Sequence, residues 1–156
     1  MPPLPRMTAP TPDISLREIT ADTVRTICDL QVLPAQGAFV ASNAISIAQA
    51  DFEPKAWFRA IHADQTPVGF VMLSLDPALP EYCIWRFMID ARYQHLGYGT
   101  RALRLVIDHI RTLPRATEVL VSYVPAEGSP EPFYRKAGFI PTGQVIDGEV
   151  VLKLVL

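Results

Sequence analysis

The sequence predicts a single α/β domain of the α+β kind, with helices flanking a mixed and mostly antiparallel sheet. Two predicted hairpins, one in the middle of the chain and one at its end, make most neighbouring strands antiparallel. Between them, a long amphipathic stretch separates two apolar strands, and this order is typical of a parallel pair. The chain has 156 residues, of which 49% are hydrophobic, so one domain with a substantial core is expected.

The first half of the domain is expected to contain strands and two helices. "ISLREIT" alternates apolar and polar side chains, as a half-buried strand does, and Pro34 and Gly37 separate the helical stretches that follow. The turn-rich "ADQTP" between two apolar runs predicts a hairpin. "EYCIWRFMID" is apolar on both faces, which is typical of a central strand. In chain order, the expected elements are a strand at 14–20, helices at 21–32 and 38–52, and strands at 55–62, 67–75 and 81–90.

The second half is expected to begin with the long helix. Apolar residues recur at helical spacing in "TRALRLVIDHIRTL", and Pro114 ends the pattern. "EVLVSYV" has the composition of a buried strand, and a short helix around "EPFYRKAG" ends at Gly138. Asp147 and Gly148 form the tip of the closing hairpin. The expected elements are a helix at 100–113, a strand at 118–124, a helix near 131–138 and a hairpin at 143–156.

Charge and composition exclude several classes of partner. The formal net charge is −2, so there is no basic excess to neutralise phosphates, and nucleic-acid binding is not expected. No apolar run approaches the ~18 residues of a membrane span, so no membrane partner is expected. His62 and His109 fall on a strand and a helix without metal-like partners, so no metal site is expected.

The cysteines and the N-terminus indicate a compartment. Cys28 and Cys83 lie far apart in apolar surroundings, which favours buried free thiols in a reducing environment. Residues 1–12 contain four prolines in the first ten positions and no apolar core of a secretory signal, so a disordered tail is expected there. The domain itself is expected at 13–156, in the cytoplasm.

The stretch "QHLGYGT" at 94–100 places two glycines between the central strand and the long helix. The first turn of a helix leaves backbone N–H groups without partners, and glycines let an anion approach them closely. The Walker pattern is absent, and although Gly97, Gly99 and Ala102 fit a dinucleotide fingerprint, its acidic residue is missing from the end of the next strand. A phosphate site is therefore predicted, with a tight strand-to-helix turn as the alternative.

Two motifs together resemble a known superfamily. "QHLGYG" is similar to the pyrophosphate loop of the GNAT superfamily of N-acetyltransferases, and "FYRKAGF" at 133–139 resembles its second signature. The order of elements is also similar, so the resemblance covers residues 13–156. "FVASNAISIAQA" and "IWRFMIDARYQ" further resemble bacterial spermine/spermidine (diamine) acetyltransferases.

The resemblance implies an acetyl-coenzyme A site in a central parallel pair that splays apart at a bulge, which Trp85 and Arg86 flank. The strand before the glycines would pair with the pantetheine arm, and the loop amides would hold the pyrophosphate. An Asn that is common in the superfamily is replaced by Glu127, which puts one cofactor contact in question. The implied cofactor-binding residues are Phe87, Met88, Ile89, Gln94, His95, Leu96, Gly97, Tyr98, Gly99 and Thr100.

The implied chemistry is direct acyl transfer to an amine. Tyr134 would donate a hydrogen bond or proton to the leaving thiolate, and packing in the core is its alternative role. Glu81 is the candidate base that deprotonates the ammonium, and it could equally be a solvated turn carboxylate after Pro80. Asp51 and Glu53 would lie near the acceptor and could attract a cationic amine, and a polar helix end is the alternative reason for their presence.

The acceptor is expected to be a small-molecule amine, and a polyamine such as spermine or spermidine fits the subfamily resemblance. A protein amine, an amino acid or an aminoglycoside are alternatives, because the sequence lacks a dense acidic patch for a multiply charged amine. A non-catalytic coenzyme-binding sensor is a further alternative. The resemblance also implies a homodimer.

Overall fold

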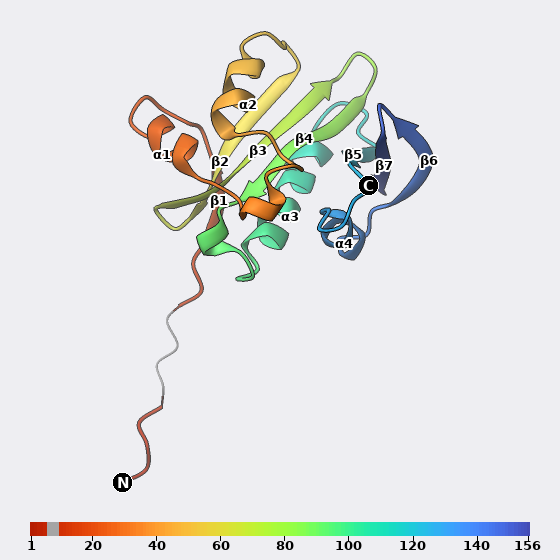
Figure 1. Ribbon diagram of the computed structural model, residues 1–156. Helices are drawn as coiled ribbons and strands as arrows, with labels where there is room; N and C mark the ends of the chain where they lie inside the picture. The colour runs from red at the N-terminus through yellow and green to blue at the C-terminus, as the bar shows by residue number, and fades with distance from the viewer. Residues whose placement is uncertain (6–9) are drawn as a thin grey trace.

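The computed structural model describes residues 1–5 and 10–156. Its strands form one sheet in the order β1-β2-β3-β4-β5-β7-β6, in which only β4 and β5 are parallel (Figure 1). This confirms the predicted fold class. The strands are β1 (Ile14–Arg17), β2 (Ala56–Ala63), β3 (Thr66–Asp76), β4 (Glu81–Ile89), β5 (Glu118–Tyr123), β6 (Ile140–Ile146) and β7 (Glu149–Val155).

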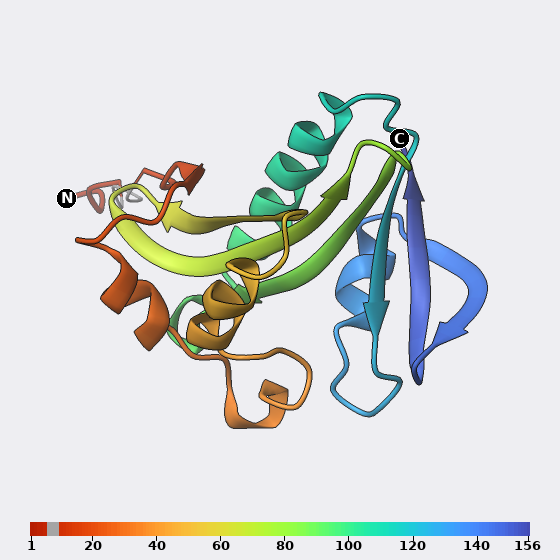
Figure 2. The ribbon, with the colours of Figure 1, turned by 90° about the horizontal axis from the view of Figure 1, so that it is seen from above.

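Helices cover both faces of the sheet (Figure 2). α1 and α2 lie on one face, where Ile27 packs against Phe70, Met72 and Met88. α3 and α4 lie on the other face, over the larger core cluster. The helices are α1 (Val24–Asp29), α2 (Asn43–Ala50), α3 (Tyr98–Arg111) and α4 (Glu131–Lys136), with 3-10 turns η1 (Pro34–Gln36) and η2 (Ala91–Tyr93).

The helices of the first half are shorter than the sequence predicts. The Thr20 N–H donates to Thr23 Oγ1 at 2.9 Å, so a turn occupies the residues before α1. Leu30 then adopts an extended conformation and ends α1. The hydroxyl of Ser42 accepts from the Ile45 N–H at 3.2 Å, and this cap sets the start of α2. The stretch between the two helices is consequently longer than predicted.

The structure tests the predictions for the two ends of the chain to different extents. Of the predicted tail at 1–12, residues 6–9 lie outside the described residues, and the remainder contains no helix or strand. The closing hairpin is confirmed, with Asp147 and Gly148 both at positive φ in its turn. No helix in the described part of the chain has the length and apolarity needed to cross a bilayer.

The centre of the sheet is bent and open. Met72 of β3 pairs with Arg86 of β4, whereas Leu73 pairs with Ile84, so Trp85 is an extra residue that makes a bulge in β4. β4 and β5 share only the register pairs Cys83–Leu120 and Ile84–Val121. Beyond these pairs the two strands diverge (Figure 2). The bulge and the splayed parallel pair implied by the sequence are therefore present.

Candidate active site

A groove of about 650 Å³ opens where β4 and β5 diverge. It lies between the segment after α1, the C-terminal half of β4, the loop before α3, the end of β5, and α4 with the residues that precede it. Leu96 in the loop before α3 and Tyr98 at the start of α3 do not line the groove. The predicted cofactor-binding residues that line it are Phe87, Met88, Ile89, Gln94, His95, Gly97, Gly99 and Thr100.

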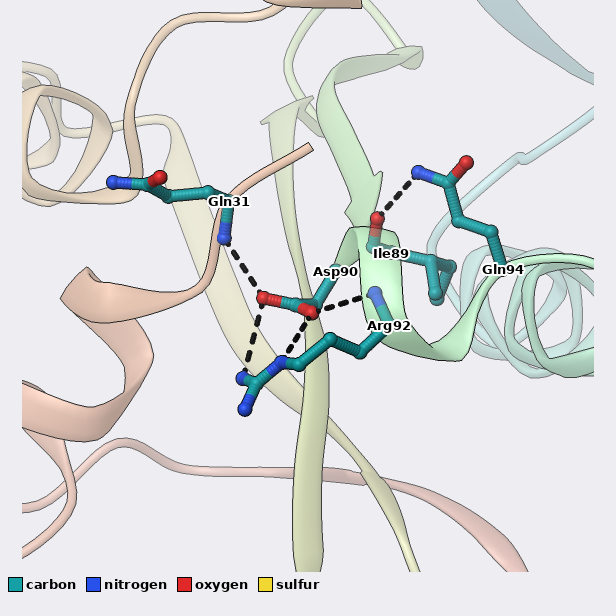
Figure 3. A network of polar contacts seen from close by, with 5 residues as sticks. All are labelled: Gln31, Ile89, Asp90, Arg92 and Gln94. Atoms are coloured by element: carbon teal, nitrogen blue, oxygen red, sulfur yellow. Dashed lines mark hydrogen bonds and ion pairs between the residues drawn. The ribbon is translucent and has the colours of Figure 1, made fainter. Parts of the chain in front are cut away.

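The loop before α3 has the backbone conformation of an anion site. His95 and Gly97 have φ values of 62° and 82°, so the chain turns sharply before the helix begins. Among the described residues, no side chain caps this end of α3, and its first backbone N–H groups have no partners within the helix. The side-chain amide of Gln94 donates to the Ile89 carbonyl at 2.9 Å and closes the loop (Figure 3). The loop therefore fits a diphosphate.

The edge of β4 inside the groove is open for pairing. No register pair joins β4 to β5 after Ile84 and Val121, although Phe87, Met88 and Ile89 continue along the groove. An extended substrate arm can add to such an edge as a further strand does.

Tyr134 is one of the residues that line the groove. Its side chain is buried, and its ring meets those of Phe133 and Phe139 edge-on at centroid distances of 5.2 and 5.5 Å. Burial raises the pKa of the Tyr134 hydroxyl well above its ordinary value. The hydroxyl therefore stays protonated at neutral pH and keeps its hydrogen for donation.

A second cavity of about 720 Å³ adjoins the groove on the N-terminal side of the bulge. Its charged lining residues are Glu53, Lys55, Arg86 and Glu149. Glu81 is exposed at the start of β4 and is not among the lining residues of either cavity. The residues that line both cavities are Phe39, Val40, Ile84, Trp85, Arg86, Ser122 and Val124.

The cations of the second cavity already have partners. Lys55 forms an ion pair with Asp76 at 2.9 Å. The Arg86 guanidinium donates to Gln49 Oε1 at 3.1 Å and to the Trp85 carbonyl at 3.2 Å. Burial lowers the pKa of Arg86, and the nearby Glu149 carboxylate partly opposes this effect.

The carboxylates of this cavity have fewer contacts. Glu149 accepts from the Ser122 hydroxyl at 3.4 Å, a long hydrogen bond, and Glu53 accepts from the Lys55 N–H at 3.1 Å. Asp51 and Glu127, which the sequence singled out, are both exposed and line neither cavity. The second cavity can therefore receive a cation at Glu149 or Glu53.

Cys83 also lines the second cavity. Both cysteines are free thiols and half-buried. Burial raises the pKa of Cys83 to about 11, and the charge of Glu81 adds to this effect. Cys83 is therefore a thiol at neutral pH rather than the thiolate that acts as a nucleophile.

Sequence reasoning did not single out several residues that line the site. Phe133 lies within the "FYRKAGF" signature and packs against Phe87 with centroids 5.7 Å apart, so its place in the motif was an available signal. Lys136 lines the groove from the same motif. Glu149 and Gln36 carry no local signal, because they reach the cavities only through the way distant segments pack.

Comparison with known proteins agrees with this geometry. The acetyltransferase (GNAT) family model matches residues 24–139. The spermine/spermidine N(1)-acetyltransferase of Bacillus subtilis (strain 168) is 27% identical over 150 residues, which cover 89% of this chain and 96% of that protein.

Solved structures share the fold. The PaiA N-acetyltransferase of Thermoplasma acidophilum in complex with coenzyme A has a TM-score of 0.70 at 15% identity, covering 92% of this chain and 99% of that one. The spermidine N-acetyltransferase of Vibrio cholerae, in complex with coenzyme A and spermine, has a TM-score of 0.70 at 13% identity and covers 91% and 95%.

Proposed function

The chain belongs to the acetyltransferase (GNAT) family, and from this membership we propose that it transfers the acetyl group of acetyl-coenzyme A directly to a primary amine of a polyamine. The observation that carries the proposal is the meeting of two cavities at the bulge of β4. The groove beyond the bulge suits the coenzyme, and we call it the coenzyme groove. The second cavity, before the bulge, suits the amine, and we call it the acceptor cavity. The two substrates then meet beside Trp85 and Arg86.

On the coenzyme side, the backbone of Phe87, Met88 and Ile89 would pair with the pantetheine arm along the open edge of β4. The stretch from Gln94 to Thr100, which we call the diphosphate loop, would hold the diphosphate through its backbone N–H groups at the positive end of α3. Lys136, which lines the groove, adds a cation for the phosphates.

Tyr134 is the proposed partner of the leaving sulfur. As the amine nitrogen bonds to the acetyl carbon, the carbon–sulfur bond breaks and negative charge develops on sulfur. A hydrogen bond from the Tyr134 hydroxyl stabilises that charge. Because burial raises the pKa of Tyr134, we assign it the role of hydrogen-bond donor in preference to full proton transfer.

Direct transfer is also supported by Cys83. An acetyl-enzyme route would need a thiolate near the meeting point of the two cavities, and Cys83 lines the acceptor cavity. Its pKa of about 11 keeps it protonated, so it does not compete with the amine as a nucleophile.

The acceptor cavity suits an amine with more than one positive charge. Lys55 and Arg86 are engaged by Asp76 and Gln49, which leaves Glu53 and Glu149 to attract ammonium groups. Relatives named for spermine and spermidine acetylation support a polyamine.

Two carboxylates are candidates for accepting the ammonium proton before attack. Glu81 is the candidate from the sequence, and Glu149 is the candidate that lines the cavity. An ammonium has an ordinary pKa of about 10.4, so a base or a chain of waters is required.

The experiment that tests the proposal is coenzyme A release with a panel of amines. The panel contains spermine, spermidine, an amino acid, an aminoglycoside and a peptide with a free N-terminus. We expect the highest kcat/KM for the polyamines. A higher kcat/KM for another amine would identify that amine as the acceptor in place of a polyamine. Tight coenzyme binding without coenzyme A release in the presence of any amine would support the sensor alternative.

A further inference from the structure

The segment at 31–41, between α1 and α2, forms one wall of both cavities. Val32 and Gln36 line the coenzyme groove, and Gly37 lines the acceptor cavity. Phe39 and Val40 line both. We call this stretch the connecting segment. Any displacement of it changes the coenzyme site and the acceptor site together.

Two side chains of the connecting segment, Val32 and Val40, pack against the core cluster under α1, and the rest of the segment has little packing. None of its residues is buried, and its regular structure is limited to the single 3-10 turn η1. Segments with few buried apolar contacts are those that open most readily from the native state. Between and around these two apolar contacts, the connecting segment depends on polar contacts to keep its place beside the two cavities.

The first of these contacts is at Asp90, directly after β4. Asp90 is 3% exposed, and its carboxylate accepts from the Gln31 backbone N–H at 2.9 Å and from Arg92 (Figure 3). The Ala91 N–H donates in turn to the Gln31 carbonyl at 2.8 Å. Burial acts to raise the pKa of Asp90, but these hydrogen bonds outweigh it and hold the pKa below its ordinary value. This contact fixes only the beginning of the connecting segment.

The second contact joins Gln36 to Gln94. The two side-chain amides exchange hydrogen bonds, with Gln36 Nε2 donating to Gln94 Oε1 at 3.1 Å and Gln94 Nε2 donating to Gln36 Oε1 at 2.8 Å. Gln36 Oε1 also accepts from the Leu33 N–H at 3.1 Å, which closes the η1 turn. Gln94 Nε2 donates to the Ile89 carbonyl as well, in the strand that lines the coenzyme groove (Figure 3). One pair of side chains thus links β4, the diphosphate loop and the connecting segment.

We propose that Gln36 is a positioning residue that couples the two cavities, so that a coenzyme held by the diphosphate loop also orders the wall of the acceptor cavity. The contact that differs between the coenzyme-bound and the coenzyme-free protein is the hydrogen-bonded pair of Gln36 and Gln94. When the loop is held by a diphosphate, Gln94 presents its amide in one place, and the connecting segment is more often seated against it. The coupling is reciprocal, so a bound amine also favours coenzyme binding. The inference rests on the proposed coenzyme site and not on the identity of the amine.

Hydrogen exchange tests the coupling without an acceptor. The full chain is compared with and without coenzyme A, and the exchange rates of the backbone amides at 33–41 are measured by mass spectrometry. We expect coenzyme A to slow exchange at 33–41 in the wild type and in Gln31→Ala, because Gln31 contributes only backbone atoms to its contacts. We expect most of this protection to be lost in Gln36→Ala. In Gln36→Glu, which keeps the accepting oxygens and loses the donor, part of it should remain.

Two further measurements separate the possible failures. Coenzyme A affinity is determined for each variant by titration calorimetry, and thermal unfolding checks that each is folded. For an accepted amine, Gln36→Ala should raise KM by about fivefold or more while the coenzyme A Kd changes less. A wild type that binds no coenzyme A overturns the proposed function. A wild type that binds it without protection at 33–41, or a Gln36→Ala variant protected as fully as the wild type, overturns the coupling alone.

Discussion

The ring of Tyr134 meets the ring of Phe139 edge-on, with 5.5 Å between their centroids, so the packing of Tyr134 uses its ring and not its hydroxyl. Tyr134→Phe should therefore keep the fold and remove only the hydrogen-bond donor. We expect kcat to fall by about 10²-fold or more, the range for loss of a hydrogen-bond donor that stabilises developing charge, while the coenzyme A Kd and the melting temperature change little. Steady-state kinetics, calorimetry and thermal unfolding measure these quantities. An unchanged kcat would assign Tyr134 to core packing alone.

The two candidate bases can be separated by substitution. Glu149→Gln removes a carboxylate that lines the acceptor cavity, whereas Glu81→Gln removes an exposed one at the start of β4. We expect Glu149→Gln to raise the KM for polyamines, because the variant loses a negative charge that faces the ammonium groups. Glu81→Gln should show the larger effect on kcat if Glu81 accepts the proton. Equal activity of both variants and the wild type across the pH range excludes both residues as the base.

Cys83 provides a test of direct transfer. Because its pKa of about 11 keeps the thiol protonated, the wild type mixed with acetyl-coenzyme A alone should gain no acetyl group. Intact-mass spectrometry measures this, and Cys83→Ser should retain most of the wild-type kcat. Transfer through an acetyl-enzyme is indicated instead if an added acetyl group appears and then disappears when the amine is added.

Gly69 of β3 lies where no side chain fits. A Cβ there would collide with the Met88 carbonyl oxygen and come within 2.9 Å of Ile89 Cδ1. Since β3 and β4 would have to separate beside the coenzyme groove, we expect Gly69→Ala to lower the free energy of unfolding by about 1–3 kcal/mol. Urea unfolding measures the change. Gly37→Ala is the matched control, because its Cβ would meet only the Pro34 carbonyl at 3.5 Å, and equal losses in both variants would refute the explanation.

His62 should make stability depend on pH. It is 5% exposed, its Nδ1 has no partner in the described residues, and burial together with Arg17 lowers its pKa. The unfolded chain takes up a proton near the ordinary pKa of about 6.5, whereas the folded chain resists protonation. The contribution of neutral His62 to the free energy of unfolding is therefore fully present above pH ~6.5 and is lost as the pH falls toward the pKa of His62 in the folded protein. His109, whose pKa is lowered by burial and by Arg59, acts in the same direction.

Urea unfolding at pH values above and below ~6.5 measures this dependence. We expect His62→Gln to lose less stability over this interval than the wild type does. His95→Gln, at an exposed position, is the control and should follow the wild type. A His62→Gln variant with the full wild-type pH dependence would show that other groups are responsible.

Local sequence patterns predicted the elements whose structure depends on near neighbours. α3 begins at Tyr98, directly after Gly97, and ends at Arg111, before Pro114, as the glycine pair and the apolar spacing indicated. The strand on each side of it belongs to the parallel pair. The bulge at Trp85 was implied by family resemblance and is confirmed by the strand register.

Local sequence patterns could not predict contacts between segments that lie far apart in the chain. Glu149 reaches the acceptor cavity because β7 lies beside β5, with Ser122 paired to Val151. Gln36 and Gln94 are 58 positions apart, and nothing in either neighbourhood indicates that they meet. The roles of Tyr134 and Glu81, the homodimer and the cytoplasmic location stay predictions.

The most direct test of the central claim is transfer of a labelled acetyl group. The wild type is mixed with acetyl-coenzyme A carrying an isotope in the acetyl group and with spermidine, and the label in the amine is compared with the free thiol released. We predict equal amounts of labelled N-acetylspermidine and coenzyme A, and much slower formation of both with Tyr134→Phe. Release of thiol without labelled amine, or no release although coenzyme A binds, would contradict the account.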